Sequence, residues 1–231
     1  SRVMAVVKAD GYGHGLERVA RALQGADAFG VAALGDAERL RAAGLSQPIV
    51  LLSGFDAADD IPQLRRLNVD TVVHHATQLA MLEQAPDGDP VRCWLKVDSG
   101  MHRLGFAPEH VRDAHARLQA MGSVADDIVL MNHFASSDEF ADAPSAGAQT
   151  KAQMQRFADA TAGLAGQRSL ANSAAVLGWP DAHADWVRPG GALYGISVVE
   201  GTTGHDFGLR PAMTLGTRLI AVNRVRQGER I

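Results

Sequence analysis

The stretch VMAVVKADGYGHGLERVARALQGADAFGVAA, residues 3–33, contains the repeating unit that predicts the fold. An apolar, β-branched run over 3–8 precedes a glycine-rich loop, and a second apolar run follows over 29–33. Between them, apolar residues recur with the i, i+3, i+4, i+7 spacing of an amphipathic helix: Leu16, Val19, Ala20 and Leu23. Gly25 stands where a helix C-terminal glycine belongs. Strand, helix and strand in this order predict two parallel strands joined by a crossover helix.

The same alternation continues along most of the chain. Strands are predicted over 3–8, 29–33, 49–53, 71–74, 93–97, 128–133, 169–172 and 186–189. Eight parallel strands within about 195 residues favour a (β/α)8 barrel of the TIM type over an open doubly wound sheet, which normally has fewer strands. The pattern changes after Tyr194, and the segment 214–225, rich in Thr, Leu, Ile, Val and Arg, is typical of the first strand of a β domain.

Composition excludes several classes of partner. The 231 residues are 46% hydrophobic and 21% charged, and the net charge of -4 comes from acidic and basic residues mixed along the chain. Without a basic stripe, no nucleic acid is expected to bind. No apolar run approaches the length of a membrane span. Cys93 is the only cysteine, which indicates a buried, inert thiol and a reducing compartment. We therefore predict a soluble, cytoplasmic protein without a metal.

Polar residues stand at the C-terminal ends of the predicted strands, the rim on which barrel enzymes build their active sites. These residues are Lys8, Lys96, Asp98, His133, Asn172, Ser173 and Arg188. Burial of Lys8 at a strand end would lower the pKa of its amine and make it a nucleophile toward a carbonyl. Each residue alone also fits a structural role: a surface lysine, a satisfied histidine, a helix N-cap serine or an ion-paired arginine.

The segment AVVKADGYGHG, residues 5–15, resembles the cofactor-lysine motif of the pyridoxal-phosphate-dependent alanine racemases. Three further regions resemble this family in the same order: KVDSGMHRLGF at 96–106, NHFASSDE at 132–139, and NSAA at 172–175 with VRPGGALYG at 187–195. The resemblance spans nearly the whole chain. It implies an isomerase of D-alanine biosynthesis, a homodimer that interconverts L-alanine and D-alanine by two-base proton transfer at Cα of the cofactor-bound substrate.

The resemblance implies a role for each matching residue. Lys8 would form the Schiff base with pyridoxal 5′-phosphate and act as one catalytic base. The cofactor-binding residues would further include Tyr12, His133, Asn172, Ser173, Arg188, Gly190, Gly191 and Tyr194, among which Tyr12, Ser173, Gly190 and Gly191 hold the phosphate. Arg188 would donate to the pyridine nitrogen, with His133 hydrogen-bonded to it. Because arginine can only donate, that nitrogen stays unprotonated.

Two cations complete the implied site. Arg103 would bind the substrate carboxylate near the phenolic oxygen of the cofactor, since its planar fork suits a carboxylate. Lys96 matches a lysine that is carbamylated in several racemases, where the resulting anion holds the arginine in place.

The second catalytic base is missing from the matches. The chain has two tyrosines, Tyr12 and Tyr194, and neither matches the family's catalytic tyrosine, which follows a segment similar to 227–231 in a C-terminal β domain. The resemblance therefore implies a cofactor-binding barrel over 1–208 and the start of a truncated β domain over 209–231. We expect this chain to bind the cofactor and to lack the second tyrosine.

Two other readings compete with a racemase. A non-enzymatic pyridoxal-phosphate carrier of the same barrel fold fits the chain length and the absent tyrosine, but not the racemase-like segments 12–15 and 100–105. A decarboxylase of related architecture would need an acidic partner on the ring nitrogen, and Arg188 is the opposite. Alanine is the expected substrate, although serine and both directions of D-alanine metabolism remain open.

Overall fold

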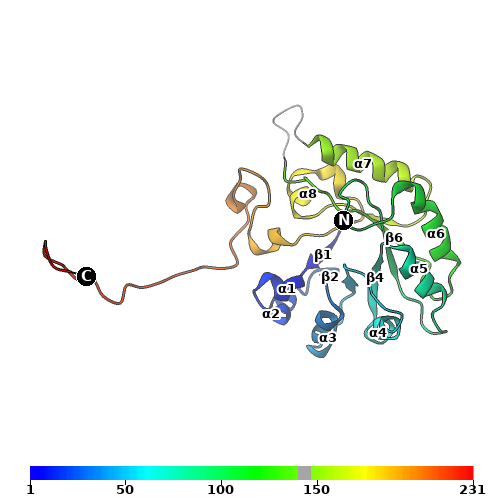
Figure 1. Ribbon diagram of the computed structural model, residues 1–231, viewed down its shortest axis with the longest axis horizontal. Coiled ribbons are helices and arrows are strands. Elements are labelled where there is room, and N and C mark those ends of the chain that lie inside the picture. The colour runs from blue at the N-terminus through cyan, green and yellow to red at the C-terminus, as the bar shows by residue number, and fades with distance from the viewer. Residues whose placement is uncertain (140–146, 231) are drawn as a thin grey trace.

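A closed barrel of parallel strands forms the body of the protein, as the sequence predicts (Figure 1). The computed structural model describes residues 1–139 and 147–230. The strands follow the chain order around the barrel: β1 Arg2–Val6, β2 Ala28–Val31, β3 Ile49–Leu51, β4 Val69–Val73, β5 Cys93–Lys96, β6 Val129–Met131, β7 Gln167–Ser169 and β8 Trp186–Val187. The first and last strands pair in parallel, with Val3 opposite Val187, and this pairing closes the ring.

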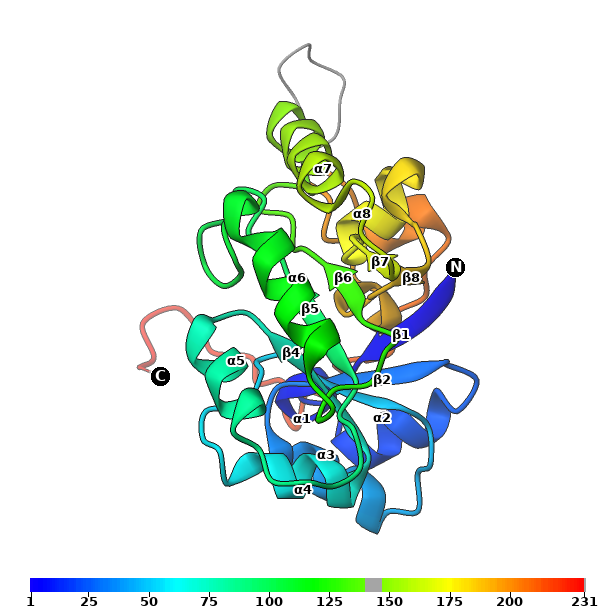
Figure 2. The ribbon, with the colours of Figure 1, turned by 90° about the vertical axis from the view of Figure 1, so that its right-hand side faces the viewer.

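Helices cover the outer side of the strands (Figure 2). Their bounds are α1 Lys8–Tyr12, α2 Leu16–Ala22, α3 Leu34–Ala42, α4 Asp60–Leu67, α5 Ala76–Glu83, α6 Val111–Ala120, α7 Ala148–Thr161 and α8 Ser173–Gly178, with short 3-10 turns η1 Pro108–His110, η2 Pro180–Ala182, η3 Gly191–Tyr194 and η4 Gly204–Phe207. Helix α4 shows how they pack, since it buries an apolar stripe of Ile61, Leu64 and Leu67. Among the described residues, no helix has the length and apolar composition that a bilayer crossing requires.

Alternation along the strands produces two cores. On β5, Cys93 and Leu95 face the helices and join the larger core between strands and helices. Trp94 points inward, where it packs with side chains from the other strands: Met4, Ala28, Val50, Val72, Val129, Met131 and Trp186. Because these side chains fill the barrel, the interior is a packed core, and a ligand can enter only at its ends.

The predicted strands agree with the observed ones to within a few residues, and the seventh shows the most informative difference. The sequence places it at 169–172, whereas β7 spans Gln167–Ser169. Its first two residues are polar and not fully buried, so they carry no apolar signal. Ser169 consequently ends the strand and faces the same rim as the other polar residues.

The segment after the barrel differs from its prediction. Residues 210–230 are exposed, and the chain runs away from the barrel (Figure 1). No strand forms within 209–230, since a strand needs a neighbour to pair its backbone groups. Large apolar side chains such as Leu215 and Ile220 are fully open to solvent there. The division into a barrel over 1–208 and a β domain beginning at 209 stays a prediction.

Replacement of Trp94 by alanine tests the inner core. Trp94 is 1% exposed, and its indole Nε1 donates to Asp70 Oδ2 over 3.1 Å. We expect Trp94→Ala to lower the free energy of unfolding by about 3–5 kcal/mol, because a large cavity replaces the indole. Urea unfolding measures this change. Leu219→Ala, at a side chain 84% exposed, should shift stability by less than about 0.5 kcal/mol, and equal effects of the two variants would contradict the filled interior.

Candidate active site

A cavity of about 530 Å³ opens at the C-terminal ends of the strands. Of the residues to which the family resemblance gives a role, all except Tyr194 line it: Lys8, Tyr12, Lys96, Arg103, His133, Asn172, Ser173, Arg188, Gly190 and Gly191. The rim residue Asp98 does not. The volume is typical of a small-molecule site. Side chains from the first, fifth, sixth, seventh and eighth strand ends therefore meet in one place.

Lys8 lies two residues after the end of β1, at the start of a turn with unusual backbone geometry. The φ angles of Ala9, Asp10, Gly11 and Tyr12 are 53°, 54°, 62° and 54°, all in the left-handed region. For residues other than glycine this costs about 1–2 kcal/mol each. Such strain persists only where surrounding contacts enforce it. Lys8 and Tyr12, at the two ends of the turn, both line the cavity.

The predicted burial of Lys8 is not observed. Lys8 is exposed in the open cavity, because it lies beyond the end of β1 at the cavity mouth. The buried lysine is Lys96, which is 6% exposed at the end of β5. Burial, together with the positive charges of Arg188, Arg103 and Lys8, lowers the pKa of Lys96 to about 8.

Tyr12, Ser173 and Gly190 form one wall of the cavity. Ser173 Oγ accepts hydrogen bonds from the backbone N–H of Gly190 (2.7 Å) and of Ala192 (3.3 Å). A Cβ on Gly190 would lie 2.2 Å from the Tyr12 hydroxyl oxygen, so only glycine fits beside that ring. The hydroxyls of Tyr12 and Ser173, gathered beside this glycine backbone, suit an oxyanion.

Tyr194 supports this wall from behind. Its ring lies 4.9 Å from the ring of Tyr12 and stacks on His14 at 4.6 Å. His14 Nδ1 in turn lies 3.1 Å from the carbonyl oxygens of Gly11 and Tyr12. The Tyr194 hydroxyl is buried and has no hydrogen-bond partner within residues 1–139 and 147–230. His14, to which the sequence assigned no role, thus joins the turn to this aromatic stack.

Arg188 directly follows β8 and is 5% exposed, and its guanidinium reaches the ends of β7 and β6. Its Nη1 donates to Ser169 Oγ over 2.6 Å, and its Nη2 donates to the carbonyl oxygens of Asn132 (2.7 Å) and Leu170 (3.3 Å). Burial lowers the pKa of Arg188 to about 10, which still leaves it charged at neutral pH. No carboxylate pairs with it in the described part of the chain.

The expected hydrogen bond from His133 to Arg188 is not among those formed by the described residues, because Ser169 and the backbone carbonyls take the guanidinium donors. His133 nevertheless lines the same cavity. Burial and the positive charges of Arg188, Lys96, Arg103 and Lys8 lower the pKa of His133 to about 3. His133 is therefore neutral at pH 7. The cavity wall carries an excess of positive charge, which favours binding of an anion.

Comparison with known proteins identifies the family. The sequence model for the alanine racemase N-terminal domain matches residues 1–198. The chain belongs to this family. It is 55% identical over 222 residues to a protein named alanine racemase from Shewanella baltica (strain OS185), covering 96% of this chain and 61% of that protein. It is 52% identical over 229 residues to one from Shewanella sp. (strain ANA-3), covering 99% of this chain and 63% of that protein.

Solved structures of the alanine racemase family show the same fold. The biosynthetic alanine racemase from Pseudomonas aeruginosa superposes with a TM-score of 0.89 at 42% identity, covering 100% of this chain and 63% of that one. The alanine racemase from Acinetobacter baumannii gives 0.86 at 34% identity, covering 100% and 64%. The chain thus spans less than two thirds of the length of these relatives.

Several contacts that shape the site could not be predicted from the sequence. Asp98 Oδ1 accepts the backbone N–H of Gly100, Met101 and His102, each over 3.0 Å, and so orders the loop that carries Arg103. The sequence marks Asp98 as a polar residue of the rim, and an aspartate can bind the backbone of a following turn. It does not show that three backbone N–H groups bind this side chain.

Gln153 on α7 supports the loop after β6. It is fully buried, donates from Nε2 to the carbonyl of His133 (3.1 Å), and accepts the N–H of Ala135 at Oε1 (2.9 Å). Helical periodicity marks position 153 as buried, yet nothing in the sequence identifies the backbone that it binds. Ser169 escaped because the predicted strand began at that residue and did not end there.

Removal of one cavity cation should raise the pKa of Lys96. Arg103 is among the charges that disfavour the protonated amine. In Arg103→Gln the charged form becomes more favourable, so the Lys96 pKa should move up from about 8. NMR of ¹³C-methylated lysines measures the titration. Arg66→Gln, which breaks an exposed pair with Glu38, is the control. A Lys96 pKa that is the same in Arg103→Gln and Arg66→Gln would contradict the charge coupling.

Proposed function

We propose that this chain is the cofactor-binding part of a pyridoxal-phosphate-dependent enzyme that interconverts L-alanine and D-alanine. One observation carries the proposal: Lys8, the oxyanion-binding wall and the cluster of cations meet in a single cavity. The likeness to proteins named alanine racemase supports the substrate. Because the chain spans 61% to 63% of the curated relatives, we propose the complete reaction only for a protein of their length.

The residues present fit the phosphate of this cofactor. Tyr12 and Ser173 offer hydroxyls, and Gly190 and Gly191 expose backbone that no Cβ shields. The lining also contains Asn172, whose Oδ1 accepts from Ala175 N and fixes the start of α8. The ring of Tyr194 packs behind Tyr12, and its hydroxyl has no hydrogen-bond partner in the described part of the chain. We propose that these groups hold the phosphate, since a dianion is stabilised by several donors at once.

The buried Arg188 fits the pyridine nitrogen. Its guanidinium has donors only and stays charged, so it binds an unprotonated ring nitrogen. When bound, pyridoxal phosphate supplies an electron sink that acidifies the Cα–H of an attached amino acid. A donor such as Arg188 leaves that sink weaker than an acidic partner would, which disfavours transamination and decarboxylation. His133, held neutral, adds no further charge beside it.

Lys8 and Arg103 are the residues that we propose to meet the substrate. Lys8 would hold the cofactor covalently and, once released, move a proton at one face of the substrate Cα. Arg103 would bind the substrate carboxylate with its two parallel donors. Inversion needs a second proton-transfer group on the opposite face. Tyr12 and Tyr194 pack against each other at the phosphate end, so we propose that a tyrosine from outside these residues, in a homodimer, provides it.

Replacement of Lys8 tests the cofactor site. Lys8→Ala removes the only amine that the proposal attaches to pyridoxal phosphate, so the visible absorbance of the reconstituted protein should disappear. Borohydride reduction followed by peptide mass spectrometry should place the label on Lys8 in the unaltered protein. Lys151→Ala, an exposed lysine on α7, is the matched control and should keep both signals. Labelling of another lysine would overturn the assignment.

Racemisation is tested separately from cofactor binding. A protein of the relatives' length should convert L-alanine to the racemate, and chiral chromatography measures the conversion. The variant Arg103→Lys should lower kcat/KM about tenfold or more, because one ammonium group cannot replace the two parallel donors of the guanidinium. Cofactor labelling at Lys8 without any racemisation would instead support the non-enzymatic carrier.

Lys96 should accept carbon dioxide. A carbamate forms only on a neutral amine, and the lowered Lys96 pKa of about 8 makes a substantial neutral fraction available near neutral pH. The new anion would also offset the surrounding cations. In ¹³C-bicarbonate buffer, the NMR spectrum should show a carbamate signal that increases from pH 7 to pH 9 and is absent in Lys96→Met. Persistence of the signal in Lys96→Met would contradict the assignment.

A further inference from the structure

Asp10 belongs to the left-handed turn between Lys8 and Tyr12, and its side chain connects this turn to the two helices that follow. Asp10 Oδ1 accepts the backbone N–H of Leu16, the first residue of α2, over 3.1 Å. The same oxygen accepts Nη2 of Arg39 from α3 over 2.9 Å. Backbone bonds from Gly11 N to Val7 O and from Gly15 N to Asp10 O also hold the turn, and His14 Nδ1 lies 3.1 Å from the carbonyl oxygens of Gly11 and Tyr12.

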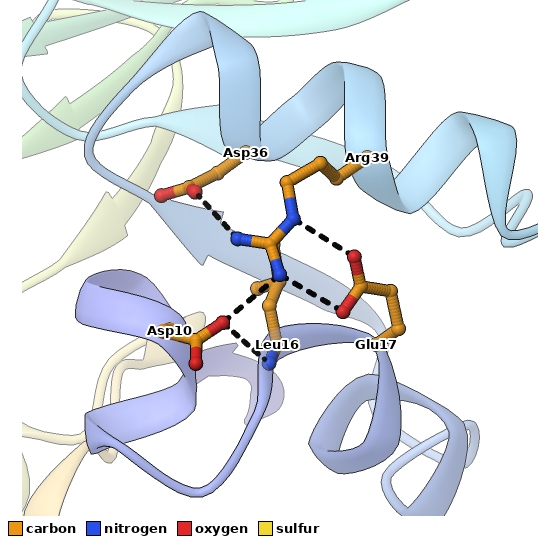
Figure 3. Close-up of polar contacts among 5 residues, drawn as sticks. All are labelled: Asp10, Leu16, Glu17, Asp36 and Arg39. Atoms are coloured by element: carbon orange, nitrogen blue, oxygen red, sulfur yellow. Dashed lines mark hydrogen bonds and ion pairs between the residues drawn. The ribbon is translucent and has the colours of Figure 1, made fainter.

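Arg39 lies at the centre of three carboxylates (Figure 3). Besides Asp10, its Nε and Nη2 donate to the two carboxylate oxygens of Glu17, over 2.8 and 3.0 Å, and Nη1 lies 3.8 Å from Asp36 Oδ1. Without the guanidinium, these three anions would repel one another around the turn. The pKa of Asp10 lies below its ordinary value because of the Leu16 N–H first and the Arg39 contact second.

We propose that Arg39 is a positioning residue, which holds the left-handed turn through Asp10 and thereby places Lys8 and Tyr12 together in the cavity. The inference rests on the proposed function for what Lys8 and Tyr12 bind. Arg39 itself does not line the cavity. An exposed ion pair alone contributes little to stability, but this one acts on backbone that is strained at Ala9, Asp10 and Tyr12.

A purely structural alternative would make Arg39 a tie between α2 and α3 through Glu17. The two explanations predict different effects of the variants Arg39→Gln and Glu17→Gln. If the contact with Asp10 matters, Arg39→Gln should loosen the turn and Glu17→Gln should not, because Glu17→Gln leaves the Asp10 bond in place. Arg66→Gln is a matched control. It breaks an exposed pair between Arg66 on α4 and Glu38, which lies next to Arg39 on α3, and neither residue contacts the turn.

Hydrogen exchange in the cofactor-free chain decides whether Arg39 holds the turn. We expect the amides of peptide 9–15 to exchange about tenfold faster in Arg39→Gln, with the unaltered rate in Glu17→Gln and Arg66→Gln. In the Asp10→Asn background, Arg39→Gln should add little, because the two side chains act as one unit. Unchanged exchange in Arg39→Gln, or equal acceleration in Glu17→Gln, overturns the proposal.

Cofactor affinity then tests whether the turn positions both groups. Pyridoxal 5′-phosphate would use Lys8 and Tyr12, whereas pyridoxal, without the phosphate, would use Lys8 alone. We expect Arg39→Gln to weaken binding of pyridoxal 5′-phosphate about tenfold and that of pyridoxal by less than about threefold, with partial recovery in Arg39→Lys. Equal losses for both ligands overturn the positioning role.

The two experiments separate the inference from the proposed function. If the unaltered chain takes up no pyridoxal 5′-phosphate at Lys8, the proposed function fails, and the exchange measurement still decides the role of Arg39 in the turn.

Discussion

The pairing of β1 with β8 is the interaction on which the rest of the structure depends. It joins residues at the two ends of the barrel sequence, with Val3 opposite Val187, and Val6 N donates to Pro189 O over 2.9 Å just beyond the paired strands. Closure removes both sheet edges and satisfies their backbone groups. It also brings Lys8 and Tyr12 beside Gly190, which lies far away in sequence. Without this contact, the cavity would lack one wall.

Closure of the barrel also gathers the positively charged side chains in one cavity. Lys8, Lys96, Arg103 and Arg188 all line this cavity, and no salt bridge formed by the described residues offsets their charge. The groups respond according to their chemistry. Lys96 and His133 lose affinity for protons, whereas Arg188 remains charged because its intrinsic pKa is so high. The result is an excess of positive charge around the cavity, which favours an anionic ligand.

Strain and support are distributed around this site. The turn after Lys8 keeps several residues in the left-handed region, and contacts from α2, α3 and the Tyr194 stack surround it. On the other side, Asp98 and Gln153 hold the loops that carry Arg103 and His133. The residues facing the ligand are thus fixed by a layer of polar contacts behind them, which is what a preorganised site requires.

The sequence by itself determined the barrel, its eight strands and the residues that gather at one end. Periodicity is local, so it identified the strands even where the ends shifted, and the polar residue after each apolar run marked the rim. The segments 5–15, 96–106 and 187–195 indicated the family for the same reason, since each is a short continuous stretch.

Only the tertiary structure decided how these residues act on one another. It showed that Lys96 is the buried lysine, that Ser169 and the backbone bind Arg188, and that Arg39 reaches the turn through Asp10. Each of these facts depends on contacts between segments distant in sequence. Burial, hydrogen-bond partners and pKa are properties of the folded surroundings, which the order of residues along the chain does not display.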